Sequence, residues 1–224
     1  MTASCSSILA KIGNFNIRNR DMNKYDKHYF ERYAELTLYG IFPEWNSHFT
    51  RSDRPDLQNE IDDIGIEVTS STPTRIREVA AFGAKLLGGK VSIKDEEKFR
   101  GELYLTPERI AYAYSPTKGL VDADRCPEIV AAIAQKRSIW KDYKDFCTRG
   151  IYIFTGTSLI DDKMLRKIEK SGAFPFFHMV FINAIDRIYY KDNGNWKMKE
   201  FTDEELSEFK KQALEINSPI FKMR

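Results

Sequence analysis

The chain has 224 residues, 42% hydrophobic and 13% aromatic, which is enough apolar material for one sizeable core and excludes a disordered chain. Its 35 basic and 33 acidic residues leave a net charge of +2. This balance neither requires nor excludes a nucleic-acid partner, because a local groove can be basic on a near-neutral protein. We expect a single domain over residues 1–224.

The cysteines and the apolar segments indicate the compartment. Cys5, Cys126 and Cys147 are far apart and form no CxxC pair, so neither a disulfide framework nor a zinc ribbon is predicted. No run of 18 apolar residues occurs, and the first residues lack the basic region of a signal peptide. We therefore expect a cytoplasmic protein with no membrane partner.

The first third of the chain is predicted to form a helix followed by short strands. Tyrosines at helical spacing predict a helix over residues 22–39 that ends at Gly40, and residues 41–50 predict a short strand. Residues 54–60 and 64–72 predict two strands joined by a tight acidic turn.

The remaining segments alternate between helices and strands. Helices are predicted over 74–87, 127–147, 161–172 and 202–216, and strands over 101–105, 110–114, 150–156, 177–192 (one long or two short) and 195–201. Thr202 and Glu205 form the pattern of a capping box at the start of the last helix. This mixed order with buried strands predicts an α/β protein with a central mixed β-sheet flanked by helices.

Two acidic residues carry the chemistry that the sequence suggests. Residues two apart share a strand face, so Glu67 and Thr69 point away from the aliphatic side chains of the same strand. If the strands before and after the acidic turn pair antiparallel, Asp56 and Glu67 stand close together across the ladder. Two such carboxylates repel unless a cation lies between them, and hard oxygen ligands suit Mg²⁺ or Mn²⁺.

The same segment carries a family resemblance. Pro55-Asp56, about ten residues, and then a hydrophobic strand with Glu67-Val68-Thr69 resembles the motif of the restriction-endonuclease-like PD-(D/E)xK nucleases. The resemblance covers about residues 25–155 and implies a restriction-endonuclease-like core, with residues 156–224 packing on it. It implies that Asp56 and Glu67 hold the divalent metal and that Glu35, in the preceding helix, is a third acidic ligand.

Thr69 stands where the family usually has a lysine, and a threonine hydroxyl cannot supply that positive charge. Some members of the family place the lysine on a neighbouring helix, and Lys136 is the best candidate here, near the buried stripe of the helix over 127–147. Four other side chains compete for this role: Lys85, Gln135, Arg137 and Lys141. His28 and Asp53 are near enough in sequence to be considered, but we interpret them as a packing residue and a loop acid.

The sequence thus leads to a functional hypothesis and an alternative. The hypothesis is a Mg²⁺- or Mn²⁺-dependent nuclease that hydrolyses phosphodiester bonds, in DNA rather than RNA, in defence, repair or nucleic-acid turnover. Asp56, Glu67, Thr69 and Lys136 would form its catalytic site, and a homodimer is one assembly that the resemblance allows. The alternative, suggested by Thr69, is an inactive nuclease fold that serves as a nucleic-acid-binding or protein-interaction module.

Overall fold

The structure is a computed structural model that describes residues 27–72, 103–105, 111–113, 126–156, 160–172, 174, 176–192 and 194–215. The chain divides into two compact units. One contains residues 78–114 and holds the antiparallel pair β4 (Leu103–Leu105) and β5 (Ala111–Ala113), in agreement with the two short strands predicted there. All other described elements lie in the second unit. The single domain over 1–224 stays a prediction, because most residues of the first unit lie outside the described ranges.

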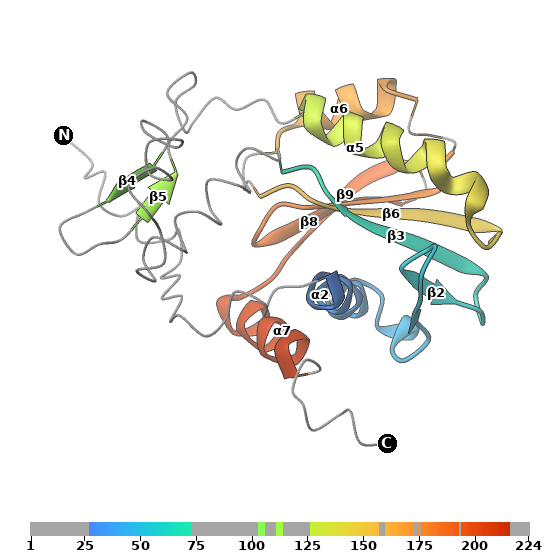
Figure 1. Ribbon diagram of the computed structural model, residues 1–224, viewed down its shortest axis with the longest axis horizontal. Coiled ribbons are helices and arrows are strands. Elements are labelled where there is room, and N and C mark those ends of the chain that lie inside the picture. The colour runs from blue at the N-terminus through green and yellow to red at the C-terminus, as the bar shows by residue number, and fades with distance from the viewer. Residues whose placement is uncertain are drawn as a thin grey trace, which may run out of the picture. The chain divides into compact units, whose positions relative to one another are not determined.

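The second unit is built on a seven-stranded mixed sheet, which confirms the predicted α/β class with helices on a central sheet (Figure 1). The strand order is β1-β2-β3-β6-β7-β8-β9. The three central strands β3, β6 and β7 are parallel, and the strands outside them pair antiparallel. The strands are β1 (Thr50–Arg51), β2 (Leu57–Asn59), β3 (Ile64–Ser70), β6 (Thr148–Phe154), β7 (Met179–Asn183), β8 (Arg187–Asp192) and β9 (Asn195–Glu200).

Helices cover both faces of this sheet (Figure 1). One face packs against α5 (Cys126–Ile139) and α6 (Asp162–Lys170), with the side chains of Ile151 and Ile153 in the core between them. The other face packs against α2 (Lys27–Ile41) and α7 (Asp203–Glu215). Burial on both faces matches the apolar stretches Ile151–Phe154 of β6 and Met179–Ile182 of β7, whereas β3 also carries the polar residues Glu67, Thr69 and Ser70.

The ends of two helices follow from local hydrogen bonds. Thr202 and Glu205 form the predicted capping box of α7: Glu205 N donates to Thr202 Oγ1 at 3.2 Å, and Thr202 N donates to Glu205 Oε2 at 2.7 Å. The side chain of Asp161 caps α6 by accepting a hydrogen bond from Met164 N. These caps satisfy backbone donors that the first turn of a helix leaves unpaired.

Two predicted helix ends and one predicted strand are wrong, and one predicted helix lies outside the described residues. Helix α2 continues through Gly40, where the missing side chain leaves room for the ring of Phe201. The predicted strand over 41–50 is a 3₁₀ turn, η1 (Pro43–Trp45), and only Thr50 belongs to a strand. The predicted helix over 127–147 ends at Ile139 and is followed by the 3₁₀ turn η2 (Trp140–Asp142). The predicted helix over 74–87 cannot be compared.

A side-chain network fixes the turn between β2 and β3. Asn59 is fully buried, and its Oδ1 accepts hydrogen bonds from Ile61 N and Asp62 N, both at 3.0 Å. Its Nδ2 donates to Asp62 Oδ2 at 2.7 Å, and His48 Nδ1 lies 3.1 Å from the same oxygen. Local bonds of this kind stabilise a turn in place of a ladder. The predicted acidic turn is therefore confirmed.

Long apolar helices are not a feature of the described segments. No helix there is both long enough and apolar enough to cross a lipid bilayer.

Candidate active site

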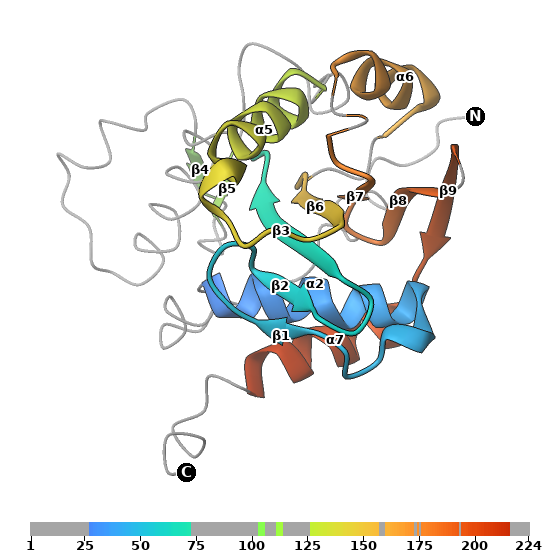
Figure 2. The ribbon, with the colours of Figure 1, turned by 90° about the vertical axis from the view of Figure 1, so that its right-hand side faces the viewer.

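The candidate site lies at the edge of β3 where its pairing with β2 ends (Figure 2). The antiparallel pairs run up to Leu57 opposite Ile66, so the next position places Asp56 opposite Glu67. Both residues are 3% exposed, and the charge of Asp56 acts on Glu67. Asp56 Oδ2 accepts a hydrogen bond from Val68 N at 2.9 Å. The Asp56 carboxylate thus accepts a backbone hydrogen bond from β3 just beyond the last residue pair of β2 and β3.

The loop before β2 holds Asp56 in this place. Ser52 N donates to Asp56 O at 2.9 Å, and Gln58 Nε2 donates to Pro55 O at 3.1 Å. A Cβ atom on Gly65 would come within 2.7 Å of the Pro55 ring and 2.6 Å of the Phe146 ring. A glycine is therefore required here, because any side chain would push Pro55, and with it Asp56, away from β3.

Helix α5 brings Lys136 to the buried carboxylate of Glu67. Lys136 Nζ lies 2.5 Å from Glu67 Oε1, and the lysine side chain is 21% exposed. Glu67 pairs with Ile151 of β6, whose side chain packs in the core beneath α5, so the Glu67 side chain is on the face that α5 covers. An ammonium group thus contacts Glu67 from the helix on which Lys136 was predicted to lie.

Burial and a second acid raise the pKa of Glu67. Burial is the larger cause, the charge of Asp56 is the next, and the hydrogen bond and charge of Lys136 partly offset both. Tyr143 also approaches Glu67, and burial together with the Glu67 charge raises the pKa of its hydroxyl group, which stays protonated and able to donate. Glu67 Oε2 still has no hydrogen-bond partner of good geometry.

A third buried acid, Glu31 of α2, lies beside Asp56. Lys27 Nζ bridges the two, at 2.9 Å from Asp56 Oδ1 and 3.3 Å from Glu31 Oε1, and it also lies 3.4 Å from Asp53. Burial and the charge of Asp56 raise the pKa of Glu31, against the opposing effects of Lys27 and His28. Burial lowers the pKa of Lys27, but the hydrogen bond and charge of Asp56 outweigh it and raise that pKa. The sequence did not lead us to expect Glu31 at this site.

Glu35, the acid that the sequence analysis named, has a different set of partners. Arg32 Nη1 and Tyr39 OH donate to Glu35 Oε1 at 2.6 and 2.8 Å, and Arg51 Nε lies 3.7 Å from Glu35 Oε2. No contact within the described segments joins Glu35 to Asp56 or Glu67. The signal that could have found Glu31 is its position four residues before Glu35, on the same helix face.

The other residues considered for the site are placed as follows. Thr69 is half-buried on the same strand face as Glu67, and no contact in the described ranges joins its hydroxyl to Glu67 or Lys136. His28 was interpreted as a packing residue, which is wrong, because its side chain is exposed; its Nδ1 lies 3.5 Å from Glu31 Oε2. Gln135 and Lys141 are exposed, and Arg137 donates to Gly172 O. Lys85 lies outside the described residues.

The donor set fits a hard divalent cation at Asp56 and Glu67. Both carboxylates are buried side by side, Glu67 Oε2 and Glu31 Oε1 lack hydrogen-bond partners of good geometry, and the raised pKa values of the two glutamates reflect crowded negative charge. Across the described ranges, no three His, Cys, Asp or Glu side chains converge closely enough to form a ready metal site. Two carboxylates nevertheless suffice for Mg²⁺, which keeps several water ligands and takes others from phosphate.

Comparisons with known proteins give no further guide to this site. The chain matched no protein-family model, no curated protein and no solved structure.

The raised pKa of Glu31 leads to a prediction about stability. The folded protein holds a proton on Glu31 more tightly than the unfolded chain, whose carboxyl group has the ordinary pKa of 4.5. The stability that this group provides is therefore complete below that value and is lost as the pH rises through the folded pKa. Glutamine is neutral at every pH and escapes this loss. We expect Glu31→Gln to be more stable than the wild type at neutral pH, with the difference shrinking in acid.

Urea unfolding of both proteins between pH 4 and pH 8 would measure this difference. Glu44→Gln, at an exposed glutamate of η1, is the matched control and should show no such trend. A difference between Glu31→Gln and the wild type that does not grow with pH would contradict the prediction.

Proposed function

We propose that the protein is a nuclease that hydrolyses phosphodiester bonds with a divalent metal ion, in DNA rather than RNA. The observation that supports this most directly is the contact of Lys136 with Glu67, next to the carboxylate of Asp56. Two acids and one lysine, arranged on a strand edge, a loop and a helix, are the groups that the restriction-endonuclease-like motif requires. We also propose that the sheet with its flanking helices is a restriction-endonuclease-like fold.

Each residue has a distinct part in this proposal. Asp56 and Glu67 would hold Mg²⁺ or Mn²⁺, and Glu31, the buried acid next to Asp56, would serve as the third acidic group in place of Glu35. When bound, the cation would activate a water molecule and offset the negative charge that develops on the phosphate. Val68 N donates to Asp56 Oδ2, and Lys27 Nζ lies next to Asp56 Oδ1. The two contacts together fix the orientation of the Asp56 carboxylate.

Lys136 would act on the substrate rather than on the cation. Its side chain is partly exposed while its amine contacts a buried carboxylate, so a phosphate that arrives from solvent would meet this side chain next to the acids. A fixed positive charge at that place stabilises the charge that builds up on a phosphate under attack. Thr69 would lie next to the reacting water or the cation.

A nuclease panel tests the proposal. The wild-type protein would be incubated with single-stranded, duplex and branched DNA and with RNA, each with Mg²⁺, Mn²⁺ or EDTA. We expect cleavage of DNA that requires one of the two metals, stops with EDTA and returns when metal is added in excess. The absence of cleavage in every combination would contradict the proposal.

One observation favours the alternative, an inactive nuclease fold that binds nucleic acid or another protein. Lys27 and Lys136 already pair with the acids, so the cluster is partly neutralised by the chain's own residues. Calorimetric titration with Mn²⁺ separates the two functions. Saturable binding of about one or two Mn²⁺ ions per chain supports the nuclease. If Mn²⁺ does not bind saturably and the nucleic acid is not cleaved, the binding module is supported.

A further inference from the structure

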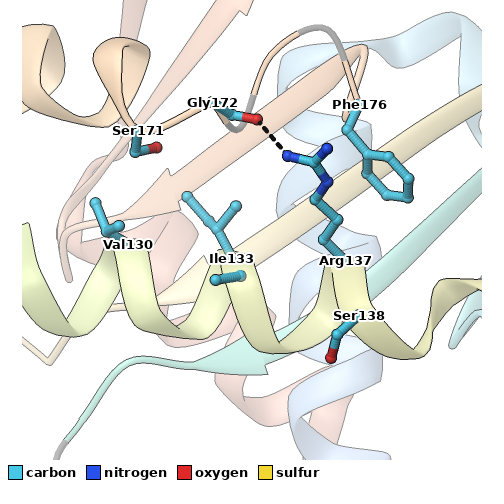
Figure 3. A pocket seen from close by; sticks show the side chains of 8 residues that line it. Val130, Ile133, Arg137, Ser138, Ser171, Gly172 and Phe176 are labelled. Atoms are coloured by element: carbon cyan, nitrogen blue, oxygen red, sulfur yellow. Dashed lines mark hydrogen bonds between the residues drawn. The ribbon is translucent and has the colours of Figure 1, made fainter.

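A groove lies along helix α5, the helix that also carries Lys136 (Figure 3). Its volume is about 340 Å³, and its wall combines apolar side chains of α5 with the segment that follows α6. The lining includes Val130, Ile133, Arg137, Ser171, Gly172 and Phe176. Figure 3 shows the guanidinium group of Arg137 over the groove, next to the ring of Phe176 and bonded to Gly172 O at 3.1 Å.

Two arginines meet at the ring of Phe176. The guanidinium carbon of Arg137 lies 5.2 Å from the ring centroid, and that of Arg149 lies 4.7 Å from it, so the two positive groups are within about 10 Å of each other. Neither arginine has a carboxylate partner among the described side chains. Arg149 Nε is moreover buried without a hydrogen-bond partner. An aromatic ring thus holds two like charges that no described carboxylate neutralises, which is an arrangement suited to an anion.

The strand register ties this pair to the candidate active site. Arg149 of β6 lies opposite Gly65 of β3, and Ile151 lies opposite Glu67. Arg149 is therefore the diagonal neighbour of Glu67 across the parallel pair, on the same face of the sheet. On α5, Arg137 directly follows Lys136, which contacts Glu67. The arginine pair and the proposed catalytic groups thus lie on neighbouring strands of the sheet and on the same helix.

We propose that Arg137, Phe176 and Arg149 form a clamp for the backbone phosphates of the DNA strand that the enzyme cuts. This inference rests on the proposed nuclease function and adds the path of the substrate. A nucleic-acid strand carries one phosphate per 3.4 Å of helix axis, so more than one phosphate falls within reach of the two arginines. Guanidinium groups bind phosphate with two parallel hydrogen bonds, and the apolar wall of the groove suits a base or a sugar.

Fluorescence anisotropy of labelled single-stranded and duplex DNA, in EDTA so that no strand is cut, tests the clamp. We expect the Arg137→Ala/Arg149→Ala protein to bind about tenfold more weakly than the wild type at 0.1 M salt. The slope of log K against log salt should fall in magnitude by about 1.4 for single strands or about 1.8 for duplex DNA, as for two lost phosphate contacts.

Two further variants serve as a control and as an independent test of the clamp. Lys210→Ala/Lys211→Ala removes the same charge from exposed positions of α7, on the opposite face of the sheet, and should bind like the wild type. Arg137→Glu changes only the exposed arginine and leaves Arg149 on Phe176, so it should weaken binding even if the double variant folds poorly. Far-UV circular dichroism and thermal melting would establish which variants are folded.

The outcomes separate the clamp from the nuclease. If both arginine variants fold and bind with the affinity and salt slope of the lysine control, or if the wild type binds no DNA, the clamp is overturned. The nuclease function is judged independently by metal-dependent hydrolysis of a small phosphodiester such as bis(p-nitrophenyl) phosphate, which is too short to need the clamp. Binding that depends on the arginines without any hydrolysis would retain the clamp and overturn the nuclease.

Discussion

Glu67→Gln is expected to lower metal-dependent DNA cleavage by at least about a thousandfold and to leave the fold intact. Glutamine has the same shape as glutamate but cannot bring a negative charge to the cation. Burial and the charge of Asp56 raise the pKa of Glu67, so the ionised carboxylate is a source of instability that glutamine removes. We therefore expect activity to disappear while the free energy of unfolding at neutral pH stays the same or rises.

Initial cleavage rates and urea unfolding would be measured side by side for this variant. Glu60→Gln is the control, because Glu60 is an exposed acid on the same hairpin that pairs with Lys144. It should cleave like the wild type. A Glu67→Gln protein that cuts DNA at the wild-type rate would remove Glu67 from the proposed chemistry.

Lys136→Met is expected to lower cleavage by about 100–1000-fold, because it removes an ammonium group that contacts Glu67. The free energy of unfolding should also fall by about 2–3 kcal/mol. Removing one partner of a fully buried pair costs roughly 3–5 kcal/mol, and Lys136 retains 21% exposure. Loss of the lysine further raises the pKa of Glu67, so the remaining activity should require a higher pH than the wild type does.

A pH–rate profile distinguishes this effect from simple misfolding. Lys136→Arg keeps the positive charge and should retain more activity than Lys136→Met, with a profile closer to that of the wild type. Lys141→Met, at an exposed lysine just beyond α5, is the matched control. Equal activity of Lys136→Met and Lys141→Met would show that the lysine on α5 does not take part in the reaction.

The elements set by local sequence patterns could be predicted, and those set by distant contacts could not. The capping box of α7 and the acidic turn after Asn59 involve neighbours in sequence, and both were read correctly. Gly40 was read as a helix end, as glycine often is, but the ring of Phe201, far along the chain, packs against it and the helix continues. No local pattern carries such a contact.

The candidate site shows the same division. The alternation along β3 and the spacing to Asp56 were sufficient to bring two acids together, because strand pairing has a fixed geometry. Local sequence could not show which of Glu31 and Glu35 lies beside Asp56. Both lie on one face of α2, but Arg51, on another element, helps to hold Glu35, whereas Asp56 and Lys27 gather at Glu31. Tyr143 likewise reads as an aromatic packing residue until its hydroxyl group is placed.

The bonds of the buried Asn59 side chain define the length of the turn between β2 and β3. Side chains alternate along a strand, so one residue more or fewer in that turn would shift the pairing by one position and turn Glu67 or Asp56 to the opposite side of the sheet. The meeting of the two acids is therefore decided at the far end of the hairpin. A one-residue insertion in that turn would therefore separate the two carboxylates without altering any residue near them.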